Sequence, residues 1–120
     1  MTKSLKAIID KRRFAIVKAK EKASAWACIE DGREITLILE ESELKKVKAI
    51  KTEKNFRLIT FDMLLPFGMT GFISKITTKL AEAKIPIFVI SAFSTDHILI
   101  KEKYLNKAIK QLESLGFEIL

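Results

Sequence analysis

The sequence is poor in the residues that build covalent cross-links and metal sites. Its 120 residues include a single cysteine, Cys28, and a single histidine, His97. One cysteine excludes an internal disulfide, and one histidine without partners at ligand spacing does not make a zinc site. We therefore expect no metal and no other cofactor, and we expect Cys28 to be a small buried residue.

Long apolar runs are also missing. No run approaches the roughly 20 apolar residues that a membrane helix needs. The first residues, MTKSLKAIIDKRR, hold too short an apolar run for a signal peptide, and no small-residue cleavage site follows them. Two prolines and four glycines argue against a long disordered or collagen-like segment. We expect a cytoplasmic protein with no membrane partner.

The chain does contain enough apolar residues for a core. Hydrophobic residues make up 48% of the sequence, and a length of 120 residues fits one compact unit. The 22 basic and 15 acidic residues give a net charge of +7, but the two signs are interleaved. Interleaved charge indicates a lysine-rich surface, which predicts weak nucleic-acid binding without sequence preference.

The first part of the chain is rich in strand patterns and lacks a convincing amphipathic helix. We expect strands at Phe14–Ala19 and Ile35–Leu39, a charged turn at Asp10–Arg13 and a tight turn at Asp31-Gly32. Residues 40–54 have apolar residues three apart, typical of a helix, but also β-branched residues typical of a strand. Both interpretations, helix and strand, stay open for this segment. We expect residues 51–55 to connect the two parts of the chain.

The second part has a clearer pattern of strands and amphipathic helices. The predicted elements, in order, are a strand at Arg57–Phe61, a helix at Gly71–Lys84, strands at Pro86–Ile90 and Ile98–Ile100, a helix at Glu102–Leu115 and a strand at Phe117–Leu120. Thr70 stands where a helix N-cap is expected. This order predicts an α+β, ferredoxin-like (βαββαβ) fold with both apolar runs of residues 85–100 as buried strands. We expect a lobe at 1–55 and a domain at 56–120 in one compact unit.

Two segments of this second part resemble a known family. The stretch IPIFVISAFSTDHILI, residues 85–100, matches the signature I-x-I-F-x-I-S-x-F-x-T-D-x-I-L-[IV] of ACT-type small-molecule sensing domains. The stretch FRLITFDMLLPFGMTGF, residues 56–72, resembles the family run W-R-x-L-x-[VF]-[ED]-G-P-L-x-F-x-x-T-G. The first part resembles a degenerate ACT-like lobe that shares the sheet. The whole is similar to small tandem ACT-domain proteins and to the C-terminal ACT lobes of CASTOR-type amino-acid sensors.

The resemblance implies a regulatory, amino-acid-binding module without catalysis of its own. Ligands of such domains lie against the first strand–helix loop. The ligand-binding residues that it implies are Phe67, Gly68, Met69, Thr70, Gly71, Phe93, Ser94, Thr95 and Asp96. Backbone amides after Thr70 suit a carboxylate, and Asp96 suits an ammonium. Met69 replaces an acidic residue of the CASTOR-type pattern, so we expect a neutral or apolar amino acid.

Each of these residues also has an ordinary structural interpretation. Gly68 and Gly71 suit a turn, Asp96 suits a turn that bonds its own backbone, and Phe67 and Phe93 suit a core. Three kinds of partner therefore stay open besides a small-molecule ligand. The chain could be an assembly module that buries the apolar loop 63–69 at a dimer interface, a homodimer that pairs through a sheet edge, or a weak nucleic-acid-binding ferredoxin-like domain.

Overall fold

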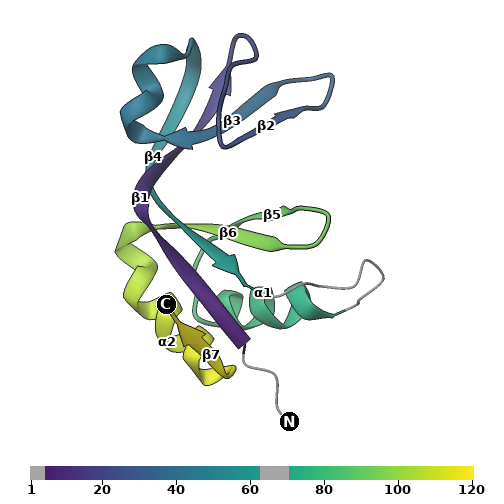
Figure 1. Cartoon of the computed structure of the whole chain (residues 1–120), viewed down its shortest axis with the longest axis vertical. Coiled ribbons are helices and arrows are strands. Elements are labelled where there is room, and N and C mark those ends of the chain that lie inside the picture. The colour runs from purple at the N-terminus through teal and green to yellow at the C-terminus, as the bar shows by residue number, and fades with distance from the viewer. Residues whose placement is uncertain (1–4, 63–70) are drawn as a thin grey trace. The chain divides into compact units, whose positions relative to one another are not determined.

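The structure, a computed structural model, describes residues 5–62 and 71–120 (Figure 1). Its elements are β1 (Leu5–Ala19), β2 (Ala27–Glu30), β3 (Ile35–Glu40), the 3-10 helix η1 (Glu41–Lys46), β4 (Ala49–Phe61), α1 (Phe72–Glu82), β5 (Phe88–Ser91), β6 (Asp96–Lys101), the 3-10 turn η2 (Glu102–Tyr104), α2 (Leu105–Ser114) and β7 (Phe117–Ile119). No helix among the described residues is long and apolar enough to cross a membrane.

The chain forms two compact units, one of which is interrupted by the other. The split unit consists of Met1–Lys11 together with Arg57–Leu120, and the inserted unit is Arg12–Phe56. Strands β1 and β4 each contribute residues to both units, because the boundaries fall inside them. Our sequence division at residue 55 grouped the first residues with the lobe that follows them, whereas the compact units group them with the C-terminal part.

The split unit has the predicted ferredoxin-like order of strand, helix, strand, strand, helix, strand, from the end of β4 to β7. This confirms the α+β fold class. A further strand joins its sheet: Leu5 and Ala7 of β1 pair in parallel with Phe117 and Ile119 of β7. The amide of Asp62, next to β4, donates to the carbonyl of Lys6 at 2.9 Å. The start of β1 therefore lies between β7 and β4, and β6 and β5 follow on the other side of β4.

Both helices of the split unit pack on one face of this sheet (Figure 1). Ile76 and Leu80 of α1 lie four residues apart, as do Ala108 and Leu112 of α2, so each pair projects from one side of its helix. They pack with Ile59, Phe61, Ile98 and Ile100 from β4 and β6 in a single buried cluster. Burial of this much apolar surface is the main stabilising term for the unit.

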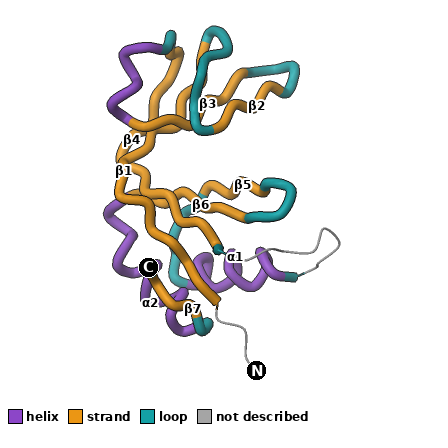
Figure 2. Tube along the Cα trace, in the orientation of Figure 1, coloured by secondary structure: helices purple, strands orange, loops and turns teal. Residues whose placement is uncertain are grey.

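The inserted unit repeats the same order of elements in reduced form. Strand β3 lies between β2 and β1, both antiparallel to it, with Val17 opposite Leu37 and Ala15 opposite Leu39. A loop at residues 20–26 and the 3-10 helix η1 stand where the ferredoxin-like order has its two helices (Figure 2). A small core collects Ala15, Val17, Ala19, Leu37 and Leu39 under partly buried residues of the loop and of η1.

Several local predictions from the sequence are wrong. The predicted turn at Asp10–Arg13 lies inside β1, and the predicted connector at residues 51–55 lies inside β4. Residues 49–55 are exposed, so their charges do not prevent a strand. Residues 40–54, for which the sequence allowed a helix or a strand, contain both: η1 comes first and the start of β4 follows it.

Burial was also misjudged at two strands that lie at sheet edges. Strand β5 was predicted to be buried, but it ends the strand order and leaves Val89 38% exposed. Cys28 is exposed on β2 at the other end of the order, not buried. The turn at Asp31-Gly32 is confirmed: the Asp31 carboxylate accepts the amides of Arg33 and Glu34 at 2.9 and 3.0 Å.

Candidate ligand-binding site

A cavity of about 320 Å³ opens at the first turn of α1 in the split unit. It is bounded by β1, by α1, and by the end of α2 and the β7 strand that follows it. Its lining residues are Leu5, Gly71, Phe72, Lys75, Ile76, Leu115 and Phe117. The size is in the range of small-molecule pockets, which are mostly apolar with few polar groups. Among the described residues of this lining, Lys75 is the only charged one.

Gly71 sets the geometry of the helix end that faces the cavity. It is the N-cap of α1 with φ of 84°, a left-handed conformation that a glycine adopts without strain. The first bond of the helix runs from the amide of Lys75 to the carbonyl of Gly71 at 3.2 Å. The amides of residues 72–74 therefore precede the helical ladder and are donors for an anion. The N-cap is Gly71, and Thr70, at which the sequence predicted the cap, lies outside the described residues.

The apolar side of the cavity is held by an aromatic cluster. Phe72 meets Phe61 edge-on with ring centroids 5.9 Å apart, and meets Phe117 at 6.3 Å. Phe61 and Phe117 are themselves 5.3 Å apart. Such tilted contacts are favourable and fix ring orientation. The cavity is therefore bounded by side chains that have little freedom to collapse into it.

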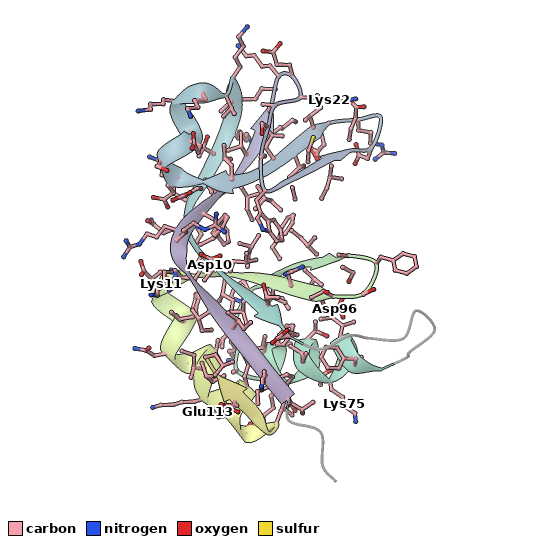
Figure 3. All side chains as sticks on the ribbon, in the orientation of Figure 1. Asp10, Lys11, Lys22, Lys75, Asp96 and Glu113 are labelled. Carbon is pink, nitrogen blue, oxygen red and sulfur yellow. The ribbon has the colours of Figure 1, made fainter. Side chains whose placement is uncertain are left out.

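The β5–β6 turn holds the other part of the predicted site. The amide of Ala92 donates to the carbonyl of Thr95 at 2.8 Å, which closes the turn. Phe93 is 80% exposed, so within the split unit it does not form a core wall. Asp96, labelled in Figure 3, is the first residue of β6. It lies opposite Ser91 and is only 9% exposed. Alternation along β6 places Asp96 on the same face as Ile98 and Ile100, the face that the helices cover.

His97, next to Asp96, points to the opposite face of the strand. Its Nδ1 lies 2.9 Å from the hydroxyl oxygen of Thr60 on β4. Burial lowers the pKa of His97, and the carboxylate of Asp96 opposes that effect. The contact with Thr60 ties β6 to β4 and gives His97 a structural role in the sheet. Among the described residues, no group of three histidine, cysteine or carboxylate side chains could hold a metal ion.

The structure thus divides the predicted site residues into three sets. Gly71 lines the cavity at α1, and Phe93, Ser94, Thr95 and Asp96 lie at the β5–β6 turn and do not line that cavity. Phe67, Gly68, Met69 and Thr70 fall outside the described residues. Their role in ligand binding, and that of Asp96, stays a prediction.

Sequence reasoning missed most of the cavity lining. Lys75 follows Gly71 by four residues, so helical spacing alone would have placed it on the same side. Leu5 and Phe117 carry no such local signal. They lie close together because the start of β1 pairs with β7, although the two strands are near opposite ends of the sequence.

Comparisons with known proteins identify the family and the fold of the chain. A family model described as ACT domain matches residues 51–114. A solved protein from Agobacterium tumefaciens superposes with a TM-score of 0.82 at 22% sequence identity, covering 99% of this chain and 94% of its own. A protein of unknown function from Vibrio cholerae gives a TM-score of 0.76 at 21% identity, with 94% and 91% covered.

A third solved structure is the ligand-free regulatory subunit of aspartate kinase from Thermus thermophilus. Its TM-score is 0.67 at 8% identity, and 97% of this chain and 100% of that chain are covered. At such identities these structures show the fold alone. No curated protein matches the chain, and the finer likeness to CASTOR-type lobes stays a prediction. Because the family model covers more than half of the sequence, the chain belongs to the ACT domain family.

Proposed function

We propose that the protein is a regulatory, amino-acid-binding ACT module without catalysis of its own. The observation that carries this proposal is the cavity at the start of α1, where backbone amides and the ammonium of Lys75 stand beside an apolar wall. A carboxylate is stabilised at a helix N-terminus and by a nearby cation. The ligand that fits has a carboxylate at residues 71–75 and an apolar part against Phe72 and Phe117.

The charge of the cavity favours a neutral side chain on the ligand. Lys75 is the charged residue among the described part of the lining, so a second cation from an arginine or lysine ligand would be repelled. Met69, which replaces an acidic residue of the CASTOR-type pattern, favours the same ligand class. Two separate arguments therefore support a neutral or apolar amino acid.

A calorimetric titration with single free amino acids tests the proposal. We expect a neutral apolar amino acid to bind more tightly than arginine and to raise the melting temperature by mass action. Lys75→Gln should weaken binding about 1.5- to 5-fold, the range for an exposed charge contact. Lys110→Gln, the same change at an exposed position of α2, is the matched control. A panel without binding, or a preference for arginine, would refute the proposal.

Asp96 gives a separate test of how the ligand is oriented. If its buried carboxylate binds the ligand ammonium, Asp96→Ala should weaken binding by roughly 2–5 kcal/mol, the cost of removing one partner of a buried pair. Unchanged affinity would place the ammonium elsewhere and leave the cavity assignment standing.

A homodimer through the β5 edge is the second candidate. Strand β5 ends the strand order and exposes Val89, so its outer backbone groups suit pairing with another strand. Light scattering should then show a dimer that Val89→Lys dissociates. A monomer at all accessible concentrations would exclude this candidate.

A further inference from the structure

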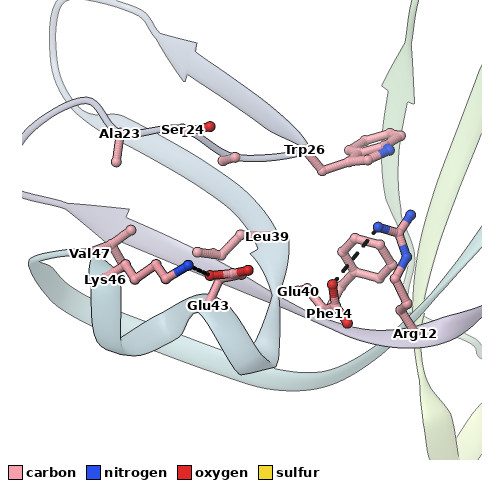
Figure 4. A pocket seen from close by; sticks show the side chains of 11 residues that line it. Arg12, Phe14, Ala23, Ser24, Trp26, Leu39, Glu40, Glu43, Lys46 and Val47 are labelled. Atoms are coloured by element: carbon pink, nitrogen blue, oxygen red, sulfur yellow. Dashed lines mark ion pairs between the residues drawn. The ribbon is translucent and has the colours of Figure 1, made fainter.

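The inserted unit has a cavity of its own, of about 450 Å³. It lies between residues 23–26 of the loop, η1 and the end of β3 (Figure 4). All of its lining residues belong to Arg12–Phe56, so it is separate from the cavity at α1.

The cavity follows from the reduced form of the inserted unit. A loop and a short 3-10 helix cover the small core where a full ferredoxin-like lobe has two α-helices. The loop contributes Ala23 and Ala25, whose side chains are too small to fill the space that a helix would occupy. Leu39 and Val47 line the apolar part of the resulting cavity.

One end of the cavity combines two aromatic rings with a guanidinium. Phe14 and Trp26 meet edge-on, with ring centroids 6.3 Å apart. The guanidinium carbon of Arg12 lies 5.0 Å from the centroid of the Phe14 ring, within cation–π range. This contact orients the guanidinium at the cavity, where a planar fork can bind a carboxylate with two hydrogen bonds.

The charges around the cavity balance. Arg12 and Glu40 form an ion pair at 4.0 Å, and Lys46 and Glu43 form one at 2.7 Å (Figure 4). The closer pair is fully formed, and its hydrogen bond lowers the pKa of Glu43. The wider pair exceeds the 2.7–2.9 Å of a charge-assisted hydrogen bond. A ligand that carries both signs can therefore give Arg12 and Glu40 closer partners than they give each other.

We propose that this cavity binds a zwitterionic small molecule with an aromatic or apolar side chain, as a second ligand site of the protein. The ligand carboxylate binds Arg12, its ammonium binds Glu40, and its side chain lies against Trp26 and Leu39. A simple anion would meet the carboxylates of Glu40 and Glu43, and a simple cation would meet Arg12 and Lys46. A molecule with both charges avoids either conflict.

Trp26 makes the test direct, because it is the only tryptophan of the chain. The titration follows Trp26 fluorescence in the full-length protein, with L-phenylalanine and L-leucine as probes. Phenylpropionate lacks the ammonium, and phenethylamine lacks the carboxylate. We expect a saturable change with the amino acids and at least about 10-fold weaker binding of each one-charge analogue.

Two variants and one control locate the site. Arg12→Gln should weaken L-phenylalanine binding about 10- to 100-fold, the value of hydrogen bonds to a charged group. Arg13→Gln makes the same charge change at a neighbouring residue outside the lining and should change affinity less than about 2-fold. Ala25→Leu should block the cavity without removing a charge. Circular dichroism of Ala25→Leu and of Arg12→Gln, compared with wild type, shows whether each variant folds. If Arg12→Gln is misfolded, the affinity of Ala25→Leu for L-phenylalanine tests the site in its place.

Three results would overturn the proposal. The first is that neither amino acid gives a saturable change in Trp26 fluorescence. The second is that Arg12→Gln and Arg13→Gln lose the same amount of affinity for L-phenylalanine. The third is that Ala25→Leu folds and binds with unchanged affinity. The Lys75→Gln variant separates this site from the one at α1. Loss of the Trp26 signal in Lys75→Gln would count against an independent second site, whereas its persistence supports one even if the α1 cavity binds nothing.

Discussion

Arg57 offers the sharpest test of how the split unit is held together. It lies on β4 with its side chain only 17% exposed. Its Nε and Nη2 atoms donate to the carbonyl of Asp10 on β1 at 3.2 and 2.8 Å. Its Nη1 lies 3.5 Å from a carboxylate oxygen of Glu102 in η2. One side chain thus joins three segments that are far apart in sequence.

The cost of Arg57→Ala can be worked out from these contacts. Hydrogen bonds that involve a charged group contribute about 1.5–3 kcal/mol. The Glu102 contact is longer and its partner is one-third exposed, so it adds at most about 0.5 kcal/mol. Loss of the packed aliphatic stem adds to this. We expect the free energy of unfolding to fall by about 2–4 kcal/mol.

Urea unfolding of wild type, Arg57→Ala and two comparison variants measures this. Arg33→Ala removes the same charge from an exposed turn and should cost less than about 0.5 kcal/mol. Glu102→Gln should also cost less than about 1 kcal/mol, because the backbone carbonyl of Asp10 is the main partner. A loss for Arg57→Ala no larger than that for Arg33→Ala would refute the reasoning.

Three further predictions follow from the fold. Gly71→Ala should lower the free energy of unfolding by about 1 kcal/mol, because a φ of 84° strains any Cβ, while the added methyl meets no atom of the described residues within 4 Å beyond its chain neighbours. In urea titrations Gly71→Asn should cost less, and equal stability of wild type and Gly71→Ala would contradict this. The fragment 56–120 lacks the strand between β7 and β4, so it should aggregate or unfold in gel filtration; a stable monomer would be unexpected. Because burial lowers the pKa of His97 below its usual 6.5, the unfolded chain binds the proton more readily. Stability should therefore be complete above pH 6.5 and fall as the pH drops below it, and His97→Gln should reduce this slope in urea titrations at several pH values.

The helices and their order could be predicted because their signals are local. Ile76 and Leu80, or Ala108 and Leu112, recur at helical spacing within a few residues of each other. Gly116 after α2 has φ of 96°, as a helix stop requires. Such local signals predict the helices and their order in the second part of the chain without knowledge of which strands pair.

The role of β1 could not be predicted because its partners are distant. Its strand pattern breaks at Asp10–Arg13, since exposed strand positions accept charge as readily as a turn does. Pairing of Leu5 with Phe117 joins residues near opposite ends of the sequence, and no neighbouring residue specifies it. The cavity at α1 depends on that pairing, so its lining was beyond a local analysis.

The course of β1 through both units has a consequence for synthesis. A ribosome completes Arg12–Phe56 before it delivers the end of β4 or β7, so Leu5–Lys11 wait without either neighbour strand while the rest of the chain is made. A strand edge without its neighbours can pair with strands of other nascent chains, and charged residues suppress such pairing. Asp10 and Lys11, two of the charges that interrupt the strand pattern in the sequence, lie on this segment and oppose such association. Chains with these residues replaced by apolar ones should aggregate during translation even where the finished fold tolerates the change.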